Sequence, residues 1–135
     1  MLLQNVNLWT VSLAAFTNVV IGSFWYSPFI LGKNWMQEKG FTEENFKKGH
    51  PIWVILLLCF LFGFMGALSM AFFLTPHSTA LSGAGMGALV SLVWISASKA
   101  NTALFENTSI KLLLIHAGYD LIGYIVMGAI LGALN

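Results

Sequence analysis

Four long apolar stretches follow one another along the chain, separated by three shorter polar segments. They cover residues 6–30, 51–74, 80–98 and 110–134. Each stretch is close to or above the ~20 residues that a helix needs to cross about 30 Å of hydrocarbon. Because unpaired backbone amides are too costly in lipid, such stretches cross it as helices. We therefore expect an all-α, polytopic membrane four-helix bundle, with residues 1–135 forming one integral membrane domain.

The composition supports a membrane protein rather than a soluble one. Hydrophobic residues make up 58% of the 135 residues and charged residues only 8%, whereas soluble domains have roughly a quarter charged residues. A net charge of +1 argues against a basic surface for nucleic acid. The first apolar stretch has no basic residue before it and is too long for a signal-peptide core, so we expect it to stay in the mature protein.

The basic residues are distributed very unevenly. All six are lysines, four in the first polar segment and two around the third, and the N-terminus, the second loop and the C-terminus have none. By the positive-inside rule, the first and third loops are expected in the cytoplasm and both termini outside. The lysines are Lys33, Lys39, Lys47, Lys48, Lys99 and Lys111.

The first loop, residues 32–50, contains the signals of a short helix. Thr42 suits an N-cap, two glutamates follow it, and two lysines come before Gly49 at the end. Trp35 and Phe41 are residue types that tolerate headgroup depth. The loop is therefore predicted to hold a short amphipathic interfacial segment, with a solvated connector as the alternative.

Asp120 is the only charged residue deep inside an apolar stretch, about 13 Å beyond Lys111 along a helix. A charge at that depth costs ~2.5–3.5 kcal/mol, which the surrounding Leu, Ile and Val residues offset. His116 lies one turn earlier on the same helical face, within hydrogen-bonding reach. The pair is either a proton relay that shares one proton or a buried polar pair that fixes helix register.

The first apolar stretch carries a matching stripe of polar and small residues. They recur at intervals of three and four and are Asn7, Val11, Ala14, Asn18, Gly22 and Trp25. Asn18 should lie at a depth similar to that of Asp120. We predict that the two stripes face each other and that Asn18 donates a hydrogen bond to Asp120 or His116. These three residues form the candidate intramembrane polar site.

Small residues at four-residue spacing indicate close helix contacts in lipid. They occur in the last three stretches as Gly63, Ala67 and Ala71, as Gly83 and Gly87, and as Gly128 and Gly132. On the last stretch, Gly118, Ala129 and Gly132 lie roughly opposite Asp120. That face would pack in a homo-oligomer, or it would contact lipid in a monomer.

The sequence contains no motif typical of a catalytic, metal or cofactor site. The three histidines are expected at different depths or sides, and there is one cysteine, so no metal is expected. The glycines of residues 83–87 lack the Lys-Ser/Thr of a phosphate loop. An enzyme is therefore disfavoured, with no catalytic residue and no cofactor assigned. Lys99 and Glu106 are expected to form a solvated cluster at the cytoplasmic rim.

A distinctive string closes the first stretch: Trp25, Tyr26, Ser27 and Pro28, then Gly32, Lys33 and Trp35. With Phe105-Glu106, Gly118-Tyr119 and the glycine-rich residues 127–132, the chain resembles the domain-of-unknown-function 1761 family of small four-helix bacterial membrane proteins. The resemblance implies an inner-membrane location and brings no substrate, reaction or catalytic residue. The string either belongs to the aromatic belt and ends the helix at Pro28, or shapes a cytoplasmic vestibule.

Two functions fit these features. One is small-solute or proton-linked transport, with Asp120 and His116 as coupling groups, Asn18 as a ligand and the Trp25–Pro28 break as an inner gate, because ionisable residues within the membrane mark functional sites. The alternative is a non-catalytic helix-bundle partner or homodimeric structural subunit. The lipid bilayer is an expected partner in both, and the small-molecule substrate is left open.

Overall fold

The computed structural model describes residues 6–134, and its elements are helical. Residues 1–5 and Asn135, which belong to the expected domain, lie outside the described residues. The elements are α1 (Leu8–Trp25), α2 (Gly32–Lys39), α3 (Glu43–Lys48), α4 (Ile52–Ala71), α5 (Ala80–Leu89), the π-helix η2 (Val90–Ile95), α6 (Ser96–Glu106) and α7 (Ile110–Leu134). Because α5, η2 and α6 are continuous, four helices are long and apolar enough to cross a membrane. The predicted all-α fold is confirmed.

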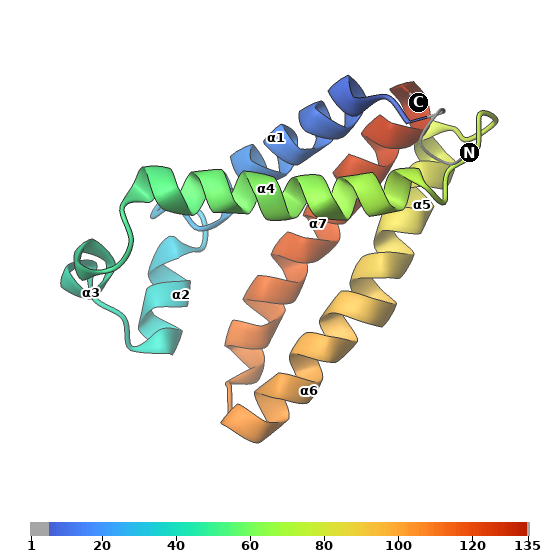
Figure 1. Ribbon diagram of the computed structural model, residues 1–135. Helices are drawn as coiled ribbons and strands as arrows, with labels where there is room; N and C mark the ends of the chain where they lie inside the picture. The colour runs from blue at the N-terminus through green and yellow to red at the C-terminus, as the bar shows by residue number, and fades with distance from the viewer. Residues whose placement is uncertain (1–5, 135) are drawn as a thin grey trace.

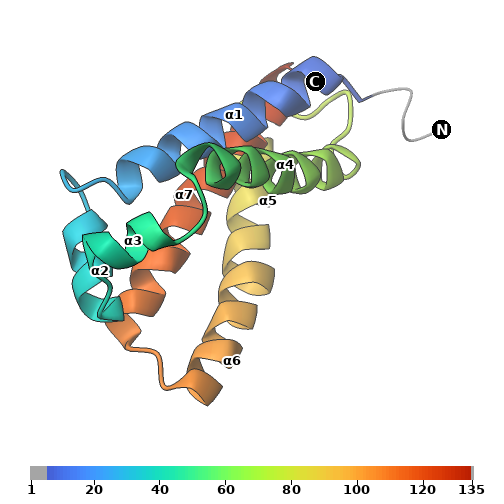
Figure 2. The same cartoon turned by 60° about the vertical axis from the view of Figure 1, so that its left-hand side comes forward.

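The helix α7 lies in the middle of the bundle, between α1 and the continuous α5–η2–α6 helix, and α4 packs on α1 (Figure 1). The helices lie close together at the end that holds the α4–α5 loop. They spread apart toward the opposite end, where α2, α3 and the α6–α7 turn are found (Figure 2). The first loop, with its four lysines, and the α6–α7 turn are therefore at the spread end of the bundle.

Small residues produce the close packing of α5 on α7. A Cβ atom added to Gly83 would overlap the carbonyl group of Gly128, and one added to Gly87 would overlap that of Tyr124. Gly132 meets the carbonyl group of Thr79 in the same way. The small-residue faces of α5 and α7 thus pack against each other within one chain. Such close packing stabilises helix association in lipid, where the hydrophobic effect contributes little.

The first loop forms two short helices rather than one. In the predicted helix, now α3, the Thr42 hydroxyl accepts from the Asn45 amide at 3.2 Å and the Asn45 side chain accepts from the Thr42 amide at 3.0 Å. This reciprocal capping fixes the start of α3. The preceding helix α2 was not predicted, and it ends at Lys39, capped by Gly40, whose φ of 70° suits glycine.

The third spanning helix is longer than the sequence indicates. The apolar stretch ends at residue 98, but the helix continues to Glu106 and stops at Asn107, which has a left-handed φ of 55°. The third loop is therefore only residues 107–109, and Lys99 lies inside the helix. The predicted end was wrong because hydropathy shows only where the side chains become polar. A helix can continue through polar residues, since its backbone hydrogen bonds do not require apolar side chains.

Candidate functional site

The direction of Lys99 depends on the π-helix in the middle of its span. Gly83, Gly87 and Ser91 are buried at intervals of four residues, and both glycines face the α7 backbone. In a regular helix Lys99 would point about 120° away from Gly87. The π-helix accommodates one extra residue and turns the following residues back by about 100°. Lys99 consequently points toward α7.

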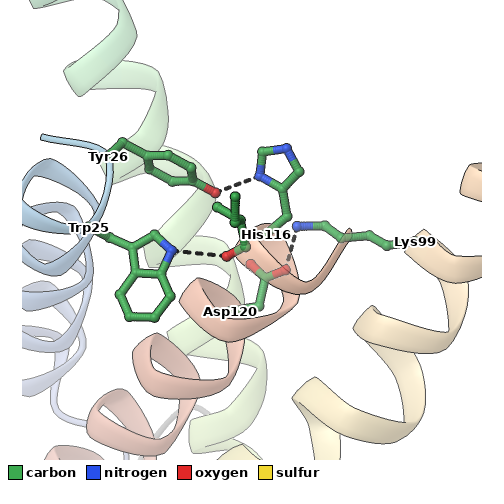
Figure 3. A network of polar contacts seen from close by, with 6 residues as sticks. Trp25, Tyr26, Lys99, His116 and Asp120 are labelled. Atoms are coloured by element: carbon green, nitrogen blue, oxygen red, sulfur yellow. Dashed lines mark hydrogen bonds and ion pairs between the residues drawn. The ribbon is translucent and has the colours of Figure 1, made fainter. Parts of the chain in front are cut away.

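Lys99 forms an ion pair with Asp120 across the α6–α7 interface (Figure 3). The Lys99 side chain is 43% exposed and that of Asp120 only 12%, so the carboxylate is the better shielded partner. Lys99 is exposed and lines the same groove as Glu106, as expected of a solvated cluster, but its ion pair with Asp120 was not predicted. A paired charge costs far less in an apolar setting than an isolated one, which explains how α7 can hold an acid at this depth.

His116 takes a different partner from Asp120. The Tyr26 hydroxyl lies 2.6 Å from Nδ1 of His116 (Figure 3). Burial, with a further contribution from the Asp120 charge, raises the pKa of the Tyr26 hydroxyl, so the phenol stays protonated at neutral pH while it is hydrogen-bonded to the imidazole. Where the sequence led us to expect a direct His116–Asp120 pair, the structure has two separate pairs, each joining α7 to another segment.

Trp25 and Tyr26 attach the end of α1 to the middle of α7. The Trp25 indole donates to the carbonyl oxygen of Ile115 at 2.9 Å (Figure 3). The same ring fills the space beside Gly118, where a Cβ atom would lie 2.9 Å from it. Tyr26 makes an edge contact with Tyr119, with 5.5 Å between ring centroids. The aromatic pair thus holds α1 in a fixed position along α7.

The rest of the sequence string forms the turn that follows α1. The Gly32 amide donates to the Ser27 carbonyl at 2.8 Å, and a Cβ atom at position 32 would collide with the Tyr26 and Ser27 backbone. Trp35 packs edge-on against Tyr26, with 5.6 Å between centroids. Pro28 and Lys33 are exposed. Within the string, Gly32 is buried, and Trp25, Tyr26 and Trp35 are half-buried.

Asn18 lies on the face of α1 that packs on α4 and α7. Its side chain touches the positions of Gly63 on α4 and Gly123 on α7, where hydrogen takes the place of Cβ. Its backbone carbonyl accepts from the Tyr119 hydroxyl at 3.3 Å. Among residues 6–134 no hydrogen bond joins Asn18 to Asp120 or His116, so the predicted partner of Asn18 was wrong.

An open groove of about 730 Å³ runs from the α6–α7 turn toward the ion pair. Its walls come from α2, α6 and α7, and they carry Glu38, Lys39, Lys99, Thr102, Glu106 and His116. Glu38 joins α2 to the start of α7, because Ser109 donates to its Oε2 at 2.9 Å and the Lys111 ammonium lies 3.7 Å from its Oε1. The groove is thus a mixed polar and apolar space with Lys99 at its inner end.

The chemistry that this arrangement offers is charge pairing and proton binding. In the described part of the chain, no three or more His, Cys, Asp or Glu side chains are placed to hold a metal ion. The groups that converge are an ammonium, a carboxylate, an imidazole and a phenol, all able to bind or release protons.

Comparison with known proteins identifies the family. The model of a family described as a protein of unknown function, DUF1761, matches residues 9–132. The chain belongs to the DUF1761 family. No curated protein and no solved structure matches it.

Lys99 is the site residue of this DUF1761 member that sequence reasoning missed as a partner of Asp120. Counting at 100° per residue from the buried Gly83 and Gly87 puts Lys99 on the wrong face. One signal was present: Lys99 and Asp120 carry opposite charges and stand on consecutive spanning helices. Consecutive spanning helices that pack side by side in opposite directions can bring such residues together. The pairing of Asp120 with a lysine of the preceding helix could therefore have been predicted.

Proposed function

We propose that this protein is a small proton-linked transporter of the bacterial inner membrane, with Lys99 and Asp120 as its coupling pair. The observation that carries the proposal is an ion pair at the inner end of an open groove. At the other end of the bundle, α5 and α7 touch through their backbones. A transporter needs such a site, reached from one side and blocked from the other.

The distribution of charge supports an orientation. The lysines of the first loop and those flanking the third are at the spread end, where Glu38 links the two loops through Ser109 and Lys111. By the positive-inside rule this end faces the cytoplasm, and both termini face outward. In this orientation the groove opens to the cytoplasm.

The ion pair supplies a reason for proton coupling. While Asp120 is ionised, its attraction to Lys99 holds α6 against α7 at the inner end of the groove. Protonation of the carboxyl group removes this attraction and leaves an ammonium that no longer has a partner in an apolar setting. Proton binding therefore favours a different arrangement of α6 and α7, as alternating access requires.

Proton flux in proteoliposomes tests this function. The vesicles carry a pH-sensitive dye inside and are offered small carboxylates, amines and neutral solutes in turn. We expect at least one class to move together with protons in the wild type. Asp120→Asn should lose the proton movement, and the double variant Lys99→Gln/Asp120→Asn, which keeps a neutral pair, should lose it too while retaining the wild-type unfolding temperature.

Three results would overturn the proposal: no solute class moves, flux occurs without protons, or Asp120→Asn behaves as the wild type. A wild type without flux whose particle size in detergent falls on Asp120 substitution would instead support the role of a helix-bundle partner or homodimeric subunit. Particle size is measured on the same preparations, so both outcomes are read from one set of proteins.

A further inference from the structure

The basic groups along the groove are more accessible than most of the acidic groups. This difference bears on the charge of the ligand that the groove would accept. Lys99 is 43% exposed, whereas Asp120 is 12% exposed and lies behind it. Lys39 is exposed on the α2 wall. Both oxygens of Glu38 face groups of their own, Ser109 and Lys111. Apart from Glu106 on the last turn of α6, an entering ligand therefore meets accessible ammonium groups.

The remaining walls of the groove fit an apolar body. Ala103, Leu112 and Leu113 line it beside the hydroxyl-bearing residues Ser98 and Thr102. Its volume of about 730 Å³ is within the range of roughly 300–1,000 Å³ that small-molecule sites occupy. A molecule with one anionic end and a short apolar part would place its charge at Lys99 and its body against α6 and α7.

We propose that the groove binds a small carboxylate with an apolar body, which replaces Asp120 as the partner of Lys99. The proposal rests on the transport function proposed above and names the substrate class of that same groove. Lys39 provides the second ammonium group at the entrance.

The exchange balances in charge and protons. Before binding, the Lys99 ammonium pairs with the Asp120 carboxylate. The incoming carboxylate forms an ion pair with the Lys99 ammonium. Asp120 is then left without its cation in an apolar span, takes one proton from water and becomes a neutral acid. One anion and one proton therefore enter together, and the net charge of the site does not change.

The other titratable groups near Asp120 are already engaged or carry no charge at neutral pH. His116 is held by Tyr26 at 2.6 Å, and the phenols of Tyr26, Tyr119 and Tyr124 are the remaining titratable groups that interact with the Asp120 charge. On the α2 side, Glu38 is bonded to Ser109, and Lys39, which lines the groove, has its ammonium 5.4 Å from the centroid of the Phe41 ring. Asp120 is thus the group that the exchange releases.

Calorimetric titration of the purified protein in lipid nanodiscs tests the proposal, with benzoate as the probe. Benzamide and benzylamine are neutral and cationic probes of nearly the same shape. Titrations in two buffers with different ionisation enthalpies report the protons taken up. We expect benzoate to bind with uptake of about one proton at neutral pH, and the other two probes to bind at least about tenfold more weakly, as expected for loss of a charge pair.

Variants separate the two members of the pair. Asp120→Asn should bind benzoate about tenfold more tightly and without proton uptake, because Lys99 is then always free. The double variant Lys99→Gln/Asp120→Asn leaves no carboxylate unpaired and should lose benzoate binding. Lys33→Gln changes an exposed α2 lysine outside the groove lining and should bind as the wild type.

The proposal is overturned if benzoate does not bind, if benzylamine binds in preference, if the wild type takes up no proton, or if the double variant still binds benzoate. No membrane gradient is involved, so these results are independent of flux. Benzoate binding with proton uptake but no flux in vesicles would remove the transport function and keep the ligand class. Flux of amines or neutral solutes without benzoate binding would do the reverse.

Discussion

Removing Val93 is expected to leave Lys99 facing Asp120, although a one-residue deletion normally turns the rest of a helix by about 100°. Val93 lies in η2, and its side chain is 52% exposed. The π-helix already holds one residue more than a regular helix, so the shortened span can close as an α-helix without turning Lys99. Inserting an alanine after Val93 is the matched control, because it adds a second extra residue and turns Lys99 away.

The two variants should differ in stability because only the insertion separates the ion pair. Removing one partner of a fully buried pair costs about 3–5 kcal/mol. Since 43% of the Lys99 side chain is exposed, we expect the insertion to lower the free energy of unfolding by a smaller amount, about 2–3 kcal/mol. The deletion should change it little, because its lost side chain faces away from the bundle.

Cross-linking measures the orientation directly. In a Cys59→Ser background, Lys99→Cys and Asp120→Cys are combined and treated with a short bis-maleimide, while unfolding is measured on proteins that keep the native pair. The cross-link should form in the full-length and Val93-deleted proteins and fail in the insertion variant. A deletion variant without the cross-link, beside an insertion variant that forms it, would refute the reasoning from the π-helix.

Three further predictions follow from contacts elsewhere. Gly83→Ala should destabilise the bundle by about 1–3 kcal/mol because its Cβ overlaps an α7 carbonyl, whereas Gly85→Ala, with nothing within 4 Å of its Cβ, should be neutral or slightly stabilising; equal unfolding midpoints would contradict this. Tyr26→Phe should cost about 1 kcal/mol at neutral pH by losing the bond to histidine. Because burial raises the pKa of Tyr26, the stability that this phenol contributes is present below about pH 10 and is lost as the pH rises further; the difference between wild type and Tyr26→Phe in chemical unfolding should shrink there, and a constant difference would argue against it. In the Cys59→Ser background, a membrane-impermeant maleimide applied to whole cells should label His77→Cys and leave Lys33→Cys unlabelled, and the opposite pattern would invert the proposed orientation.

The spanning helices could be predicted because lipid imposes a strong and simple condition on the backbone. Apolar runs of sufficient length must be helical, and α7 begins and ends where the last run does. Capping chemistry likewise located α3 at Thr42. The helix α2 could not be found in this way, since its contacts are with α7, as in the bond between Glu38 and Ser109, and its own residues form no apolar stripe.

The partners within the site could not be predicted from the sequence. Spacing along a helix shows which residues share a face, but it does not show which side chain of another segment each residue contacts. His116 and Asp120 do stand one turn apart, but each reaches a side chain from another segment instead. Asn18 was expected to reach them, yet packs against glycines of two helices. In addition, the π-helix adds one residue to its span and so rotates the residues that follow it. No residue type in residues 90–95 indicates a π-helix.

The glycine contacts between α5 and α7 give the protein a lever. They lie at one end of a helix that rises about 28 Å from Gly87 to Glu106, so a tilt of about 10° at the contact carries the far tip by about 5 Å. A shift the size of a side chain at the groove entrance thus needs almost no repacking at the fulcrum. Adding even one methyl group at that contact would therefore displace the far end of the helix more than the contact itself.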